Sequence, residues 1–262
     1  MDNLVTLLNS FCDEQPFHTG WFLKDLHSGE TAERFAHQVV PSASTRKISI
    51  LSAAMKAVHD GRISLNQPIP IKAKYQQNTS GCFYLLEPGF SLVFKDHLTM
   101  MIIVSDNTCT GTVVDIVGLD QVNEFCDAIG MKRTTHRYGI PPGNLDRNHP
   151  LEANNTTTPA DVGLLLDLLL RGTLDSKEAA CMGSTQELCQ LAVDILSWQK
   201  FNDKLPFFLP EGTKVAHKTG TGERNHNDAG IIYLGNKPLF ILTVYTDNVP
   251  KQLPNGTSGA YA

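Results

Sequence analysis

The chain has 262 residues, of which 41% are hydrophobic and 19% are charged, so it has the composition of an ordinary globular protein. Its formal net charge of −5, without a long basic run, argues against nucleic acid and anionic membranes as partners. No apolar stretch has the length of a membrane-spanning helix, and the first fifteen residues lack the features of a signal peptide, so we expect a cytoplasmic protein.

The first predicted elements are an amphipathic helix and a β-hairpin. The apolar face of the helix carries four side chains at helical spacing: Leu4, Leu7, Leu8 and Phe11. The hairpin has strands at 21–26 and 31–40, joined by a turn at 27–30. Six cysteines are scattered along the chain without any C-x-x-C pair, which favours reduced thiols over a disulfide framework or a zinc site.

A buried helix is predicted next, from Ser44 to about Gly61. Pro41 and Ser42 supply a turn and an N-cap before it, and Gly61 suits a helix stop. The segment 48–58 is apolar enough to be a buried helix. Residues 62–96 are rich in turn residues and are expected to wrap a helical lobe.

Helices fill the middle of the chain and strands return at its end. The helical segments are expected at 95–104, 107–118, 119–129, 159–170, 174–181 and 185–198, with a long loop at 131–157. The strands are expected at 213–220, 227–234 and 237–247, the last apolar on both faces like a central strand.

Strands at both chain ends predict one sheet built from the two termini. We therefore expect an α+β fold in which an antiparallel sheet is flanked by helices and a helical lobe is inserted between its strands. The sheet lobe comprises 1–43 and 207–262, and the helical lobe comprises 44–206. The crevice between the two lobes is the natural place for an active site.

The first candidate for chemistry is Ser44-Thr45-Arg46-Lys47 at the start of the buried helix. A serine and a lysine three residues apart lie on one helix face, about one turn from each other. The positive end of the helix dipole favours negative charge developing on the hydroxyl. A lysine held in its neutral form can take the hydroxyl proton. The pattern alone is weak, because it recurs at Ser197-Trp198-Gln199-Lys200.

Two further motifs follow in order. Ser105-Asp106-Asn107 separates two helical segments, and Lys218-Thr219-Gly220 lies on the first strand after the helices end. Ser-x-x-Lys, Ser-Asp-Asn and Lys-Thr-Gly form the set found in class A β-lactamases and penicillin-binding proteins. The segments 98–108, 156–159 and 218–232 also resemble that family. The chain is thus similar, over roughly residues 18–250, to a class A β-lactamase-type serine hydrolase of the penicillin-recognising superfamily.

The resemblance implies a role for each catalytic position. Ser44 would attack a carbonyl and form an acyl-enzyme. Lys47 would act as the base, its pKa lowered by the nearby charge of Lys218. Ser105 would pass a proton to the leaving nitrogen.

The resemblance also implies a substrate-binding set. Asn107 would bind substrate and orient the base, while Lys218 and Thr219 would hold a substrate carboxylate. The backbone N–H groups of Ser44 and Thr221 would form the oxyanion hole. Gly220 would let the substrate approach the strand closely.

The loop at 137–155 departs from the family pattern. Class A β-lactamases carry a Glu-x-x-x-Asn there, whose glutamate activates the deacylating water, and this spacing is absent. Glu152, near Asn154 and Asn155, is the best candidate for a deacylating acid, with Asp146 and His149 weaker ones. A solvated loop acid is the alternative interpretation of Glu152.

Two other segments differ as well. The sequence after the Lys-Thr-Gly strand, Asn225-His226-Asn227-Asp228, lacks the arginine that often binds a substrate carboxylate in the family. Residues 248–262 are polar and rich in turn residues where family members usually have a terminal helix.

The leading hypothesis is a serine hydrolase that cleaves a small-molecule amide, most simply a β-lactam or other cyclic amide. An acyltransferase or esterase of the DD-peptidase or penicillin-binding type is the alternative, and a non-catalytic β-lactam sensor is a third. None of them needs a metal or another cofactor, and the nine scattered histidines are a weak zinc signal.

Overall fold

A computed structural model describes residues 2–77, 80–143 and 145–259. The helices are α1 (Asp2–Asp13), α2 (Lys47–His59), α3 (Phe94–Ile103), α4 (Asn107–Val117), α5 (Leu119–Ala128), α6 (Pro159–Leu174), α7 (Ser176–Cys181) and α8 (Gln186–Ser197). Short 3-10 turns are η1 (Ala43–Arg46), η2 (Ala73–Tyr75), η3 (Phe83–Leu85) and η4 (Leu151–Ala153). The strands are β1 (His18–Asp25), β2 (Thr31–Arg34), β3 (Val40–Pro41), β4 (Pro68–Pro70), β5 (Ser91–Val93), β6 (Thr156–Thr157), β7 (Val215–Thr221), β8 (His226–Leu234) and β9 (Lys237–Asp247).

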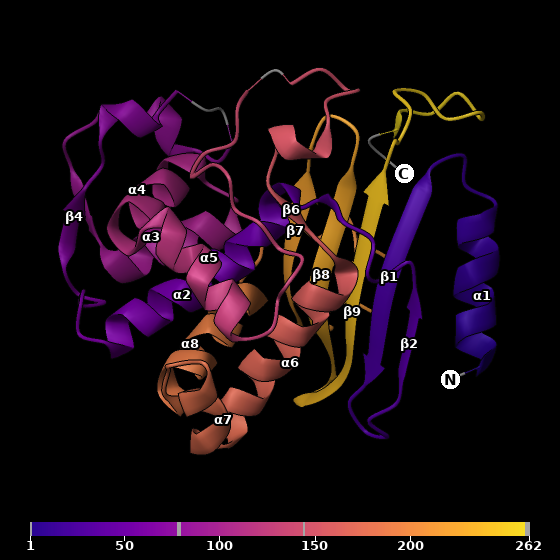
Figure 1. The fold of residues 1–262 in the computed structure, drawn as a ribbon, viewed down its shortest axis with the longest axis horizontal. Helices are drawn as coiled ribbons and strands as arrows, with labels where there is room; N and C mark the ends of the chain where they lie inside the picture. The colour runs from indigo at the N-terminus through magenta and orange to yellow at the C-terminus, as the bar shows by residue number, and fades with distance from the viewer. Residues whose placement is uncertain (1, 78–79, 144, 260–262) are drawn as a thin grey trace.

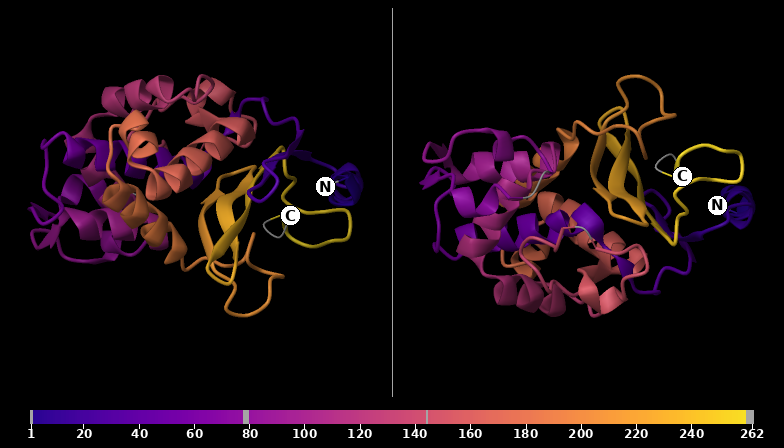
Figure 2. Two further views of the ribbon diagram at one scale, coloured as in Figure 1. Left: turned by 90° about the horizontal axis from the view of Figure 1, so that it is seen from below. Right: turned by 90° about the horizontal axis from the view of Figure 1, so that it is seen from above.

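Both chain ends contribute to one antiparallel sheet of order β2-β1-β9-β8-β7 (Figure 1). β9 lies in the middle, which confirms the prediction of a central strand from its apolar character. Helices α6 and α8 pack on one face of the sheet, and α1 lies on the opposite face (Figure 2). The predicted α+β fold, with helices inserted between strands from the two ends, is therefore confirmed.

Helix α2 lies at the centre of the helical part of the molecule. Nearly all of its residues from Lys47 to Ala57 are buried, because α3, α4, α5 and α8 contact it from different sides. The largely apolar sequence of 48–58 predicted that this helix lies inside the core. Ser42 does not act as the predicted N-cap. Its side chain makes no cap hydrogen bond, and its Oγ donates to Asn155 O at 3.1 Å instead.

The apolar face predicted for the first helix was wrong. Leu7 and Phe11 are 68% and 66% exposed, while Cys12 is buried against β1 together with Val5 and Leu8. The buried stripe is therefore shifted by one residue from the predicted one. The shift arises because the sheet face that carries Trp21 and Leu23 decides which side of the helix is covered.

The six cysteines all lie in the described part of the chain and none forms a disulfide there. Within these residues no helix has both the length and the apolarity that crossing a membrane requires. No helix or strand is assigned between 248 and 259, in agreement with the polar, turn-rich sequence of that segment.

Candidate active site

Ser44 lies in the short turn η1, directly before α2. The preceding residue, Ala43, has a positive φ of 44°, a conformation that costs energy for a residue with a Cβ. Thr45 fixes the turn, because its hydroxyl donates to Ser42 O at 2.6 Å and accepts from Tyr245 Oη at 2.8 Å. Strand β9 thus holds in place the turn that carries the half-buried Ser44 hydroxyl.

Ser44 opens onto a cavity of about 390 Å³ between the sheet and the helices. The cavity is lined by residues from η1, from the turns before α3 and α4, from the α8–β7 connection and from β7: Ser44, Ser80, Ser105, Lys200, Phe201, Asn202, Asp203, Lys204, Thr219 and Thr221. The predicted crevice site and the serine motifs therefore meet at one place.

Lys47 is the first residue of α2 and is only 1% exposed. Its Nζ contacts Ser105 O at 2.7 Å, Ser105 Oγ at 3.1 Å and Asn107 Oδ1 at 2.7 Å. Burial is the main cause that holds the pKa of Lys47 well below its usual range, and the charges of Lys218 and Arg46 add to it. The sequence interpretation named only the like charge of Lys218, so it missed the larger cause.

The turn between α3 and α4 presents Ser105 and Asn107 to that amine. Ser105 has a positive φ of 55°, which marks a second strained residue beside the cavity. Asp106 stabilises the turn: its carboxylate accepts from Cys109 N at 2.9 Å as the N-cap of α4 and from the amides of Cys82 and Phe83 at 2.8 Å each. A buried carboxylate therefore holds the turn in a conformation that Ser105 would not adopt easily.

Lys218 lies on β7 and is fully buried. Its Nζ donates to Thr219 O at 2.8 Å, and burial lowers its pKa to about 7, an effect that the charge of Asp228 opposes and that of Lys204 strengthens. Two residues on, Gly220 passes close to the serine: a Cβ there would lie 3.1 Å from Ser44 N. A glycine at 220 therefore lets β7 lie beside the nucleophile backbone.

The deacylation candidates do not reach the cavity. Glu152 belongs to η4, its side chain is exposed, and it is not among the residues that line the cavity. Asp146 is exposed as well, and His149 contacts its own neighbour, with Nδ1 at 3.0 Å from Pro150 O. Asp203 supplies the carboxylate among the described lining residues, and its side chain is 67% exposed.

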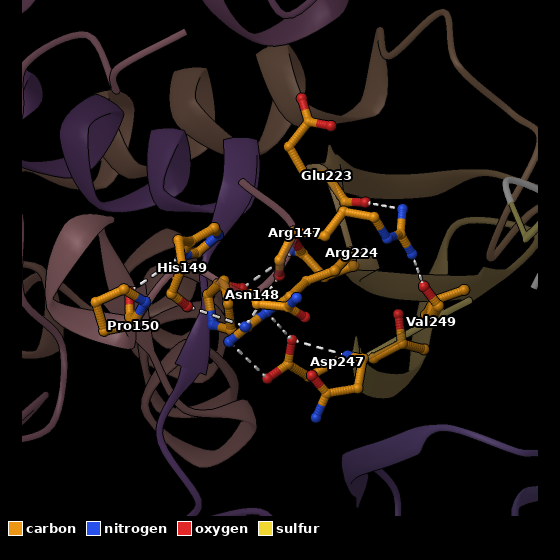
Figure 3. A network of polar contacts seen from close by, with 12 residues as sticks. Arg147, Asn148, His149, Pro150, Glu223, Arg224, Asp247 and Val249 are labelled. Carbon is orange, nitrogen blue, oxygen red and sulfur yellow. Dashed lines mark hydrogen bonds and ion pairs between the residues drawn. The ribbon is translucent and has the colours of Figure 1, made fainter. Parts of the chain in front are cut away.

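The loop that contains these residues is clamped to the sheet by two arginines (Figure 3). Arg147 donates to the backbone oxygens of Glu223 and Val249. Arg224 donates to Arg147 O at 3.2 Å and His149 O at 3.0 Å, and its Nε lies 2.7 Å from Asp247 Oδ1. The clamp explains why this loop can be long and polar and still be fixed beside the β7–β8 turn.

Sequence reasoning missed the wall at 200–204. Lys204 points toward β7, with Nζ 3.5 Å from Thr221 Oγ1, and its side chain is 19% exposed. Lys200, from the second Ser-x-x-Lys, also lines the cavity although Ser197 does not. Residues 201–204 carry no motif, so the sequence offered no signal for them, and the motif of Lys200 pointed to Ser197 and not to this cavity. Ser80 was missed for the same reason; it lines the cavity and donates from Oγ to Ser105 O at 2.8 Å.

The described residues offer no centre for a metal ion: within 2–77, 80–143 and 145–259, no three His, Cys, Asp or Glu side chains are suitably grouped. The site contains a serine on a strained turn (Ser44), a buried amine (Lys47), a second serine (Ser105) and a strand that carries a buried lysine (Lys218). A family model described as the beta-lactamase enzyme family matches residues 3–260. The chain belongs to that family.

Relatives and solved structures agree with this membership. A beta-lactamase of Phocaeicola vulgatus is 26% identical over 60% of this chain, and the match spans 50% of that protein's length. Beta-lactamase BRO-1 of Moraxella catarrhalis is 25% identical over 82% of the chain and 66% of its own length. The structure of a beta-lactamase from Sphaerobacter thermophilus superposes with a TM-score of 0.81 at 27% identity, covering 94% of this chain and 89% of that one.

A second kind of neighbour has the same fold. A variant of PBP-A, whose structure is that of an acyl-enzyme complex with penicillin G, superposes with a TM-score of 0.83. It is 26% identical and covers 98% of this chain and 91% of that one. The fold by itself therefore does not separate β-lactamases from penicillin-binding proteins.

Proposed function

We propose that the protein opens β-lactams by forming an acyl-enzyme on Ser44 and then hydrolyses that ester. The observation that carries this proposal is the buried Lys47 amine, held by Ser105 and Asn107 beside a cavity that Ser44 lines. The names of the relatives in the same family support β-lactams as the substrate class.

Acylation follows from the positions of these groups. The neutral form of Lys47, favoured by burial, takes the proton of Ser44 as its Oγ attacks the lactam carbonyl. A C–O bond forms and the C–N bond of the ring breaks. Ser105 Oγ, 3.1 Å from Lys47 Nζ, passes the proton to the ring nitrogen, so that the nitrogen leaves as a neutral amine.

Negative charge on the carbonyl oxygen is stabilised between η1 and β7. The backbone N–H groups of Ser44 and Thr221 are the donors we assign to the oxyanion hole, because β7 lies against Ser44 N at Gly220. Any larger residue at 220 would push β7 away from the serine. The position of Thr221 supports this assignment, since Thr221 is the last residue of β7 and lines the cavity.

The carboxylate of the substrate is bound by Lys218, Thr219 and Lys204. Lys218 supplies a charge from within β7, and Lys204, which lines the cavity with its Nζ 3.5 Å from Thr221 Oγ1, supplies a second one. Lys204 thereby replaces the arginine that the segment 225–228 lacks. The two amines and the threonine hydroxyl fit an anionic group better than a neutral one.

A second candidate function has its own support. Because Glu152 is exposed and outside the cavity, the acyl-enzyme has no assigned loop carboxylate to activate water. A penicillin-binding or acyl-transferring protein, in which the acyl group persists, needs no such residue. The superposition with a PBP-A acyl-enzyme complex supports this alternative. The six free thiols support the cytoplasmic location that we propose with either function.

One experiment separates these functions. The protein is mixed with a chromogenic cephalosporin and with penicillin G, and turnover and intact mass are followed together. We expect turnover that is lost in Ser44→Ala and kept in the matched Ser197→Ala. A stable adduct without turnover would contradict the hydrolase and favour the acyltransferase or the sensor. If the protein forms no adduct and shows no turnover, β-lactams are not its substrates.

A further inference from the structure

The cavity wall at 200–204 is held by hydrogen bonds at its two flanking residues, Gln199 and Leu205. The buried Gln199 side chain donates from Nε2 to Ile102 O at 3.0 Å. Its Oε1 accepts from the amides of Lys200 at 2.9 Å and Phe201 at 3.0 Å. The start of the wall is therefore attached to the end of α3, next to the Ser105 turn, and it meets a substrate as a preformed surface.

A buried acid and a buried histidine hold the other end of this wall. His217 on β7 and Asp228 on β8 have side chains that are 1% and 2% exposed, and Nδ1 lies 3.0 Å from both carboxylate oxygens. Asp228 also accepts from Leu205 N at 3.1 Å and from Ala229 N at 2.9 Å. The Asp228 carboxylate thus connects β8, the His217 ring and the backbone at Leu205.

The other ring nitrogen of His217 reaches the cavity wall. Its Nε2 lies 3.3 Å from Oδ1 of Asn202, which lines the cavity. An amide oxygen only accepts, so in this arrangement the Nε2 of His217 is the donor. The Nδ2 group of Asn202 then remains available as a donor toward the cavity. Among the described residues, this Nδ2 group has no hydrogen-bond partner.

We propose that Asn202 is a substrate-binding residue and that His217 and Asp228 are positioning residues that turn its amide donor toward the substrate. The inference rests on the proposed function. Asn202 lines the same cavity as Lys204, Thr219 and Thr221, where the substrate carboxylate is assigned, and the Nζ of Lys204 lies 3.5 Å from Thr221 Oγ1. In a β-lactam the carboxylate is on the nitrogen side of the broken bond.

Asn202 therefore recognises a hydrogen-bond acceptor on the leaving part of the substrate. The charged groups around it are compatible with this: Lys204 and Lys200 favour an anionic leaving part, and Asp203 is mostly exposed. The preferred substrate class is thus an acyl compound whose amine or alcohol portion carries a carboxylate or a second acceptor. A neutral apolar leaving part would leave the amide donor without a partner.

The test uses two aryl esters with one acyl group, one with a carboxyphenol and one with a phenol as leaving group. The rate of Ser44 acylation is measured by mass and by release of the phenol. We expect the wild-type protein to prefer the carboxylated ester and Asn202→Ala to lose roughly tenfold of that preference. The quantity compared is the ratio of the two acylation rates, so an equal loss of both rates in the variant would not support the role given to Asn202.

The positioning role is tested by a double-mutant cycle. His217→Phe should reduce the preference as Asn202→Ala does, and adding Asn202→Ala to it should cause no further loss. His217→Gln, which keeps a donor toward Asn202, should restore part of the preference. Phe208→Ala is the matched control, because Phe208 is on the same connection, is 93% exposed and does not line the cavity.

Failure of this inference differs from failure of the proposed function. If the wild-type protein acylates Ser44 but Asn202→Ala keeps the full preference, Asn202 does not bind the substrate. If the losses of Asn202→Ala and His217→Phe multiply in the double variant, His217 does not act through Asn202. If neither ester nor any β-lactam acylates Ser44, the proposed function itself is wrong.

Discussion

The protein contains two Ser-x-x-Lys segments that differ in almost everything except their spacing. In the first, Ser44 belongs to a strained turn and Lys47 is buried at the start of α2. In the second, α8 ends at Ser197, whose hydroxyl donates to Asp194 O at 2.7 Å, and Lys200 is exposed beyond the helix end. The comparison teaches that a motif becomes reactive through its surroundings, because burial changes the proton affinity of the amine.

The largest expected effect separates the two serines. Ser44→Ala should lower the acylation rate with a chromogenic cephalosporin by roughly 10³-fold or more, because Ser44 carries the hydroxyl of that turn that lines the cavity, whereas the Thr45 hydroxyl is buried against Tyr245. Ser197→Ala should stay within about twofold of the wild type, since its hydroxyl only contacts its own helix. Stopped-flow absorbance measures both. Equal losses in the two variants would contradict the assignment of the nucleophile.

The two lysines are expected to differ nearly as much. Lys47→Met should lower kcat/KM by roughly 10²- to 10⁴-fold, as for loss of a general base. The same change removes a buried amine and should leave the melting temperature unchanged or higher. Lys200→Met should change kcat/KM by less than about tenfold, because Lys200 only borders the cavity. A larger effect of Lys200→Met than of Lys47→Met would reverse the comparison.

A pH profile extends the comparison to Lys218. Its pKa is lowered from 10.5 to about 7, so the cation that binds a carboxylate is lost as the pH rises through about 7. We expect kcat/KM for a carboxylated substrate to fall above this pH. An unfolded lysine keeps its proton up to about 10.5, so the unfolded state binds more protons between these values. The free energy of unfolding should therefore rise with pH in this window.

Lys218→Met is the control for that profile. It should abolish the fall of kcat/KM near pH 7 and make the rise of the unfolding free energy less steep, measured by urea titration at several pH values. Part of the rise remains, because the pKa of the buried Lys47 is lowered as well. Lys200→Met should leave both curves as they are in the wild type. A wild-type profile without a change near pH 7 would contradict the role given to Lys218.

The smallest expected effect concerns the loop acid. Glu152→Gln should leave the deacylation rate within about twofold of the wild type, because the side chain is exposed and outside the cavity. The rate is measured by mass as the acyl group disappears after rapid acylation. A slowing of tenfold or more would show that the loop brings this carboxylate to Ser44 during the reaction.

Much of the fold could be predicted from the chain because its signals are local. The apolar run of β9 predicted a central strand, and the largely apolar segment after Lys47 predicted the buried helix α2. Of the residues that the three motifs singled out, Ser44, Ser105 and Thr219 line the cavity, and Lys47 contacts Ser105 and Asn107 beside it. The covered face of α1 could not be found in this way, because Leu8 belongs to both possible apolar stripes and only the sheet selects one.

The sequence by itself determined the reactive groups and their order: a serine and lysine, then a serine and an asparagine, then a lysine on a strand. Tertiary structure decided which serine and lysine are buried, that Glu152 lies outside the cavity, and that Lys204 and Asn202 form its wall. The physical reason is that burial and electrostatic shifts arise from residues distant in the chain. The turn at Ser44 depends on Tyr245, two hundred residues away, and no local pattern encodes that contact.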